Sequence, residues 1–176
     1  MLGEAQRVGA LGSSPLFEII RHATWFADAI PIEAREIVDL GSGAGVPGLI
    51  VAIARPELRV TLVDRRQKRV DALVRAIALL AMGDQVTAVC VDVDKIRAEV
   101  SWQGRFDAAI SRGFGPPLQT LMWSAQLVRR GGAVIISEPP YEIGDRWVGV
   151  DLAALGVVGP TRVGPLAMFH VEHQNI

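Results

Sequence analysis

Residues 36–48, with the sequence EIVDLGSGAGVPG, constrain the fold more than any other part of the chain. Ile37, Val38 and Leu40 are typical of a short buried strand. The glycines that follow let the backbone turn sharply and let a ligand approach it closely. Pro47 has the fixed φ angle and the missing N–H group that suit the start of a helix. A strand, a glycine turn and a helix N-terminus together predict a nucleotide-binding corner with free N–H groups directed at the ligand.

This corner fits two patterns for nucleotide cofactors. Residues 43–48 match G-x-G-x-x-G, the dinucleotide fingerprint. Asp39, Gly41, Gly43 and Gly45 instead give D-x-G-x-G-x-G, which resembles the first motif of class I S-adenosylmethionine methyltransferases. We favour the second interpretation, because a charged Asp39 would repel a pyrophosphate but would attract the ammonium group of methionine. An NAD-dependent oxidoreductase is disfavoured further because no second mononucleotide-binding half is visible.

The rest of the chain alternates between helix and strand patterns. Ser14 is expected to cap a helix that runs to Ile30, and further helices are expected at 49–54, 67–82 and 118–128. Strands are expected at 59–63, 86–91, 106–110 and 133–136, with an antiparallel pair at 156–158 and 166–171. We therefore expect residues 15–176 to form one Rossmann-like α/β domain with a doubly wound sheet, mostly parallel with an antiparallel C-terminal strand. Residues 1–14 are expected to form a mobile tail.

Acidic residues follow two of the expected strands. Asp64 ends the second strand, where a carboxylate can accept both ribose hydroxyls of a nucleoside, whether the cofactor is NAD or S-adenosylmethionine. The alternative for Asp64 is helix capping. Asp92, Val93 and Asp94 follow the third strand and are expected at the ligand crevice, where they can hold an adenine amino group. Capping of the helix that follows is an equally weighted alternative.

The loop at 111–117 follows the fourth strand and is expected to face the reacting methyl group. Arg112 is its candidate catalytic residue, because a guanidinium can pair with a cofactor carboxylate or with a substrate phosphate. A second basic feature is the helix face made by Arg65, Arg66, Lys68, Arg69 and Arg75. Such a face can meet RNA phosphate or can simply be solvated.

Composition limits the remaining function classes. The formal net charge of −1 lacks the basic excess of a general nucleic-acid binder. Cys90, expected in or near the core, is the only cysteine, so no intramolecular disulfide can form, which fits a cytoplasmic protein. No apolar run approaches the roughly 20 residues of a membrane helix. His170, Glu172 and His173 alternate with apolar residues as on a half-solvated strand, so we expect no metal site.

Four motifs occur in an order that resembles one family. They are DLGSGAGVPG at 39–48, LVD at 62–64 with Lys68 and Arg69, SRGF at 111–114, and GG at 131–132. Together they look like the small-subunit ribosomal RNA guanine-N7 methyltransferase family, also called the glucose-inhibited division protein B family, over about residues 15–136. The resemblance implies S-adenosylmethionine as cofactor and ribosomal RNA or the small ribosomal subunit as partner.

The resemblance also implies roles for individual residues. Gly41 and Val46 would contact the cofactor, Val93 and Asp94 would hold adenine, and Arg112 would reach the methionine end. A sulfonium methyl group is already activated, and guanine N7 offers a lone pair without a proton, so alignment matters more than a general base.

The chain departs from the family at two places. It is shorter at the N-terminus, and it has Ser137 and Glu138 where the family usually has Lys and Gly after the fifth strand. The lost cation bears on the substrate and leaves the cofactor assignment intact. Two alternatives therefore stay open: a small-molecule methyltransferase on the same core, and a non-catalytic S-adenosylmethionine-binding module.

Overall fold

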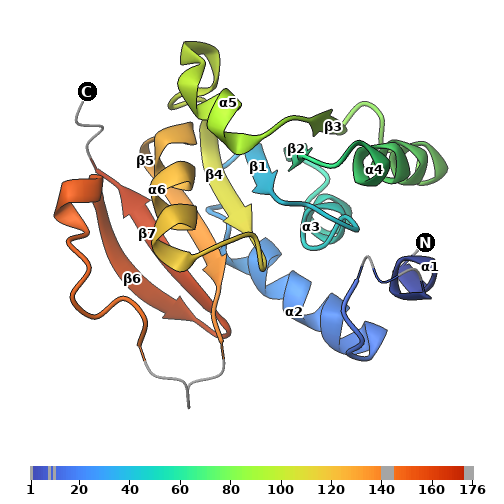
Figure 1. The fold of residues 1–176 in the computed structure, drawn as a ribbon, viewed down its shortest axis with the longest axis horizontal. Coiled ribbons are helices and arrows are strands. Elements are labelled where there is room, and N and C mark those ends of the chain that lie inside the picture. The colour runs from blue at the N-terminus through green and yellow to red at the C-terminus, as the bar shows by residue number, and fades with distance from the viewer. Residues whose placement is uncertain (1, 8, 10, 140–144, 173–176) are drawn as a thin grey trace.

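The strand that precedes the glycine turn lies inside a seven-stranded sheet with the order β3-β2-β1-β4-β5-β7-β6. This computed structural model describes residues 2–7, 9, 11–139 and 145–172 (Figure 1). The strands are β1 (Glu36–Leu40), β2 (Arg59–Asp64), β3 (Val86–Cys90), β4 (Phe106–Ser111), β5 (Val128–Ser137), β6 (Val157–Val163) and β7 (Leu166–Val171). The α-helices are α1 (Leu2–Arg7), α2 (Leu16–Ala29), α3 (Gly48–Ala54), α4 (Gln67–Leu79), α5 (Val93–Ala98) and α6 (Pro117–Leu127).

The pairing of the strands confirms the expected α/β class. Strands β1 to β5 are joined by parallel ladders, and β7 pairs antiparallel with both β5 and β6. The chain runs outward from β1 through β2 to β3, then returns to β4 on the other side of β1. This reversal places a crevice beyond the carboxyl ends of β1 and β4, which is where open α/β sheets bind their ligands.

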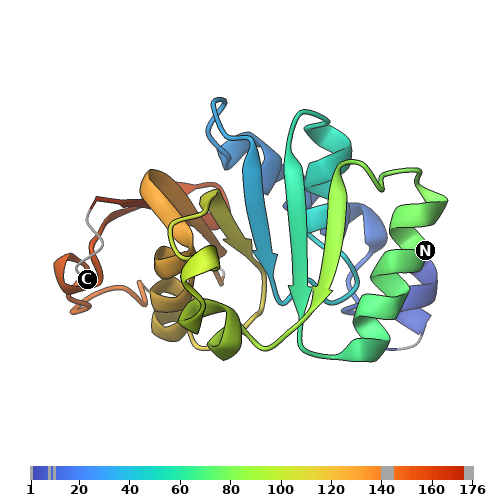
Figure 2. The same ribbon diagram turned by 90° about the horizontal axis from the view of Figure 1, so that it is seen from above.

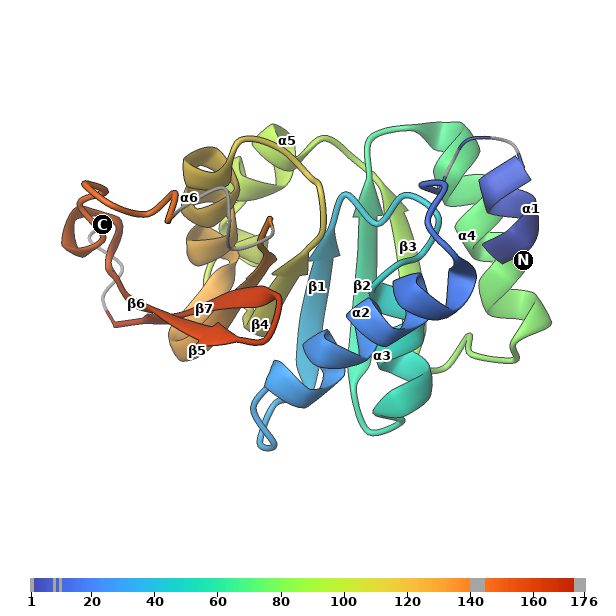
Figure 3. The same ribbon diagram turned by 90° about the horizontal axis from the view of Figure 1, so that it is seen from below.

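Helices cover both faces of the sheet, and each face has its own apolar core. One core contains Phe26 of α2, Leu49 of α3 and Leu73 of α4. The other contains Ile96 of α5 and Leu121 of α6. Figures 2 and 3 view these faces from opposite directions, and α2 and α3 lie in front of the sheet in Figure 3. A sheet covered on both faces explains the nearly continuous apolar sequences of β1 and β4.

The structure corrects three local expectations. Ser14 does not cap α2, because Pro15 occupies the N-cap position and no side chain supplies a cap hydrogen bond. Cys90 is exposed, because β3 is an edge strand and Cys90 is its last residue. Strand β5 begins at Val128, so residues 129–132 belong to the strand that was expected only at 133–136.

The N-terminal segment contains more structure than the sequence suggests. Residues 2–7 form α1, and Gln6 donates side-chain hydrogen bonds to the backbone carbonyls of Gly12 and Ser14. Leu2 and Leu11 pack against a small cluster around Ile19. The mobility of residues 1–14 stays a prediction.

Candidate active site

The glycine turn is fixed against the end of β2. The backbone N–H groups of Gly41 and Ser42 both donate to the carbonyl of Val63, at 2.9 and 3.0 Å. Gly41 has a φ angle of +73°, and a Cβ atom there would lie 2.5 Å from Cδ2 of Phe114. Position 41 therefore requires glycine both for its backbone conformation and for the ring packed over it.

Asp39 is fully buried beneath this turn. Its Oδ2 accepts a hydrogen bond of 3.0 Å from the backbone N–H of Gly48, the first residue of α3. Its Oδ1 has no hydrogen-bond partner within the described residues. Burial raises the pKa of Asp39 from 3.8 to about 7, because the ionised form loses its hydration. Asp39 thus ties the end of β1 to the start of α3 and does not form part of the ligand-facing wall.

Asp64 ends β2 and is only 6% exposed. Its carboxylate accepts backbone hydrogen bonds from Gly43 at 3.1 Å and from Arg66 at 2.9 Å, and Arg69 lies 3.5 Å away. The contact with Arg66 orders the entry to α4, but the capping alternative is wrong, because Arg66 is the N-cap residue of α4 and no side chain caps the helix. A carboxylate has about four acceptor sites, so Asp64 keeps capacity for a ligand.

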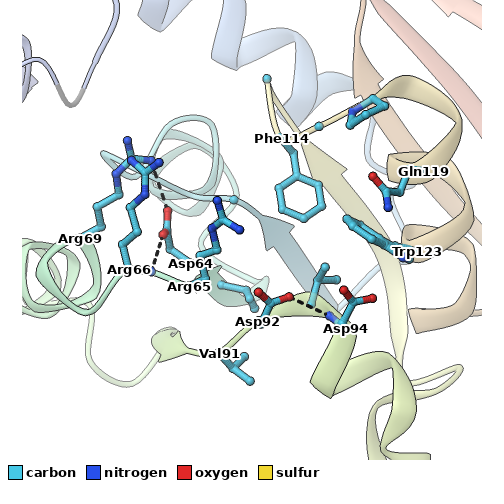
Figure 4. A pocket seen from close by; sticks show the side chains of 16 residues that line it. Asp64, Arg65, Arg66, Arg69, Val91, Asp92, Asp94, Phe114, Gln119 and Trp123 are labelled. Carbon is cyan, nitrogen blue, oxygen red and sulfur yellow. Dashed lines mark hydrogen bonds and ion pairs between the residues drawn. The ribbon is translucent and has the colours of Figure 1, made fainter.

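A cleft of about 460 Å³ opens beside Asp64, and we call it the main cleft. Figure 4 shows Phe114 and Trp123 on the side of the cleft opposite Asp64, Arg66 and Arg69. The two rings lie 5.7 Å apart between centroids. The lining residues include Gly41, Asp64, Arg65, Arg66, Arg69, Asp92, Val93, Asp94, Phe114, Gln119 and Trp123. This combination of apolar rings and carboxylates suits a nucleoside.

Asp92 and Asp94 enter the main cleft from the start of α5. Oδ1 of Asp92 accepts a hydrogen bond of 3.1 Å from the backbone N–H of Asp94, which makes Asp92 the N-cap of the helix. The capping alternative therefore holds for Asp92, while both side chains still line the cleft.

A second pocket of about 390 Å³ adjoins the main cleft, and we call it the middle pocket. Gly113, Phe114 and Gly115 line both cavities, so the loop after β4 separates them. Arg112 lies on the middle-pocket side of this loop. Burial lowers the pKa of Arg112, and its side chain has no hydrogen-bond or ion-pair partner within the described residues. A half-buried guanidinium without a protein anion is suited to an anionic ligand.

Glu138 stands where the resemblance leads one to expect a cation, and its surroundings restore positive charge. Its Oε1 accepts hydrogen bonds from Arg146 Nη2 at 2.6 Å and from Trp147 Nε1 at 3.1 Å. Its Oε2 lies 2.9 Å from Arg162 Nη1. One buried carboxylate thus holds two guanidinium groups, and Arg146 lines the middle pocket. Sequence reasoning missed this arrangement, because Arg146 and Arg162 meet Glu138 only in the folded chain.

The expected site residues divide into those that line the main cleft, those that support the glycine turn, and Arg112, which lines the middle pocket. Gly41, Asp64, Asp92, Val93 and Asp94 line the main cleft.

The remaining glycines and Val46 support the turn. Gly43 donates to Asp64, while a Cβ atom on Gly45 would clash with Leu49. Val46 packs in the small cluster with Ile19. Arg112 faces the neighbouring pocket. Trp123 and Gln119 were not anticipated, because the sequence of α6 signals only a helix with one apolar face.

Two further features concern metals and membranes. Within the described residues, no three His, Cys, Asp or Glu side chains gather as a metal site. Three residues were considered for a metal site from the sequence: His170, Glu172 and His173. His170 belongs to β7, and His173 lies outside the described part of the chain. No helix in the described ranges is long and apolar enough to span a bilayer.

Solved structures share this fold at low sequence identity. An S-adenosylmethionine-dependent O-methyltransferase from Thermotoga maritima matches with a TM-score of 0.66 and 14% identity, covering 89% of this chain and 66% of its own. An O-methyltransferase family protein from Burkholderia thailandensis matches with a TM-score of 0.62 and 17% identity, covering 90% and 58%. The architecture is therefore that of Rossmann-like class I methyltransferases.

Curated relatives are similar over part of the chain. Proteins named ribosomal RNA small subunit methyltransferase G are 41% identical over 110 residues in a Nocardioides species and 39% identical over 103 residues in Mycobacterium leprae. These matches cover 62% and 56% of this chain, but only 41% and 39% of the relatives. The model of the family described as GidB, rRNA small subunit methyltransferase G, matches residues 15–138. Because that match spans most of the chain and both the glycine turn and the Arg112 loop, the chain belongs to the GidB family.

Proposed function

We propose that this protein binds S-adenosylmethionine in the main cleft and transfers its methyl group to RNA. The observation that carries the proposal is the meeting of Asp64, the glycine turn and the Asp92–Asp94 segment around one cleft, with Arg112 in the pocket next to it. The relatives' name and the family description support a ribosomal RNA substrate.

The groups around the main cleft fit this cofactor. Asp64 has acceptor capacity for ribose hydroxyls, and Asp94 with the backbone at Val93 can hold an adenine amino group. Phe114 and Trp123 offer apolar surfaces to the purine. Gly41, over which the Phe114 ring packs, lines the cleft where the glycine turn leaves β1. Asp39 contributes indirectly from beneath the turn, by holding the start of α3 against the end of β1.

The proposed reaction is methylation of guanine N7 in small-subunit ribosomal RNA, in the cytoplasm. When bound, S-adenosylmethionine supplies a methyl group that its sulfonium centre already activates. The residues of this chain then have to align the acceptor and keep water out. Arg112 would orient the substrate phosphate or the cofactor carboxylate, and Arg146 would add positive charge to the middle pocket. Guanine N7 loses no proton, so the site needs no general base.

The test is transfer of a labelled methyl group to three substrates: small ribosomal subunits, naked ribosomal RNA and a pool of small metabolites. We expect the label on a guanine of the ribosomal RNA. Label confined to a metabolite would place the chain among small-molecule methyltransferases. Cofactor binding without transfer to any RNA would indicate a non-catalytic binding module. Either of these results contradicts the proposal.

A further inference from the structure

A third pocket continues the row formed by the main cleft and the middle pocket. Its volume is about 490 Å³, and we call it the Trp25 pocket. It shares His22 and Arg112 with the middle pocket. Its lining residues are Ser14, Glu18, Ile19, Arg21, His22, Trp25, Arg112 and Pro165. A polymer whose reacting unit occupied the middle pocket would therefore meet the Trp25 pocket next.

Trp25 presents a fixed aromatic surface to this pocket. The side chain is 40% exposed, although it lies on α2 beside the core. A Cβ atom on Gly164 would lie 2.7–2.8 Å from three atoms of the six-membered indole ring, Cε3, Cδ2 and Cζ3. Nearly equal distances to three ring atoms mean that the ring stacks flat on the Gly164 backbone. The glycine holds the indole in place from one side and leaves the rest of the ring accessible.

The charges around the indole favour an anion. Arg21 is exposed and Arg112 is half-buried, and neither side chain has an ion-pair partner within the described residues. Among the described residues, Glu18 is the one carboxylate in the wall. His22 lies half-buried between the two pockets, and its burial, together with Arg112, lowers its pKa, so it is neutral at pH 7. Two guanidinium groups against one carboxylate leave a net positive charge.

We propose that the Trp25 pocket binds a nucleotide adjacent to the target guanine, with its base stacked on Trp25 and the connecting phosphate paired with Arg112 and Arg21. Bases of any sequence can stack on an aromatic side chain, and arginine pairs well with phosphate. Because Arg112 lies in the wall of both pockets, one phosphodiester at Arg112 can join the two nucleotides. This inference rests on the proposed RNA substrate and makes it a single-stranded segment of at least two nucleotides.

The experiment measures equilibrium binding of a short single-stranded RNA containing guanine, in the presence of the demethylated cofactor. Trp25→Ala should weaken RNA binding about 5- to 150-fold, as expected for loss of one stacked base. Trp25→Phe should recover most of the affinity because it keeps an aromatic ring. Arg21→Gln should flatten the salt dependence of binding, whereas the control Arg130→Gln should not. Arg130 is exposed near the start of β5, at the amino ends of the parallel strands and away from their carboxyl ends.

Affinity for S-adenosylmethionine reports folding of every variant and should stay unchanged. Methyl transfer, measured in parallel, separates the two proposals. A wild type that methylates RNA, with Trp25→Ala binding RNA equally well, overturns the Trp25 subsite alone. Trp25-dependent RNA binding without methyl transfer overturns the proposed reaction and keeps the subsite. Absence of RNA binding by the wild type overturns both.

Discussion

The backbone N–H of Gly43 donates a hydrogen bond of 3.1 Å to the carboxylate of Asp64. This contact joins the turn after β1 to the end of β2, so the two principal elements of the main cleft are held by one side chain. Asp64 therefore has a structural role in ordering the turn and a proposed binding role at the ribose. Substitutions at this position test both.

Replacing Asp64 with alanine should weaken S-adenosylmethionine binding by about 10- to 150-fold, since hydrogen bonds to a charged group contribute roughly 1.5–3 kcal/mol. Isothermal calorimetry measures the dissociation constant, and circular dichroism checks that the variant is folded. The matched control is Asp84→Ala, because Asp84 is an exposed carboxylate just before β3, at the amino ends of the parallel strands. An unchanged dissociation constant for Asp64→Ala would rule out its role in binding.

Asp39 should make the fold less stable as the pH rises from about 4 to 7. The folded-state pKa of about 7 exceeds the value of 3.8 for an unburied Asp, because burial penalises the charge. Between these values the folded protein holds a proton that the unfolded chain has released, so unfolding becomes easier with increasing pH. The full change is about 4 kcal/mol, from 1.36 kcal/mol for each pKa unit.

Urea unfolding of the wild type and Asp39→Asn at several pH values measures this effect. The amide keeps an acceptor for the Gly48 N–H but does not titrate. The free energy of unfolding of the wild type relative to Asp39→Asn should therefore fall between pH 4 and 7. A difference that stays constant, or rises, would mean that Asp39 is ionised in the folded protein throughout this range.

Substitution of Gly41 by alanine should destabilise the fold and weaken cofactor binding. A left-handed backbone costs an alanine about 1–2 kcal/mol, and the new methyl group would also press against Phe114. Thermal unfolding and calorimetry measure the two effects. Adding Phe114→Ala should relieve the steric part and leave the backbone part. Gly83→Ala is the control: its Cβ would meet open space, so a lower melting temperature there would undermine this explanation.

Loss of the Arg112 side chain should reduce kcat more than RNA affinity. The guanidinium is the group expected to align the reacting partners, and misplacement by even 1 Å can cost about 100-fold in rate. Single-turnover methyl transfer at saturating RNA gives the rate, and RNA binding is measured separately for Arg112→Ala. Equal losses in rate and affinity would indicate that Arg112 only holds the RNA.

Local sequence signals predicted much of the fold and part of the site. The strand before Asp39, the turn at Gly41 and the acidic end of β2 are encoded within short segments, because each depends on apolar patterning and glycine at fixed spacing. The parallel sheet then brings the carboxyl ends of its strands to one edge. This explains why Asp64 and Asp94 lie on the same cleft as predicted.

Features that depend on distant segments were not predictable in the same way. In the sequence, Glu138 replaces an expected cation. In the fold, β6 brings Arg162 to it, and the segment between β5 and β6 brings Arg146. The exposure of Cys90 depends on β3 being an edge strand, which only the strand order decides. Trp123 reaches the main cleft because α6 packs beside the loop that carries Phe114.

Methylation of ribosomal RNA by this chain can be tested by mapping methylated nucleosides in small-subunit ribosomal RNA by mass spectrometry, in cells with and without the gene. We predict that one guanosine loses its methyl group on deletion. The wild-type gene should restore the modification, whereas the Arg112→Ala gene should restore much less. Identical methylation maps in the two strains would contradict the claim that this chain methylates ribosomal RNA.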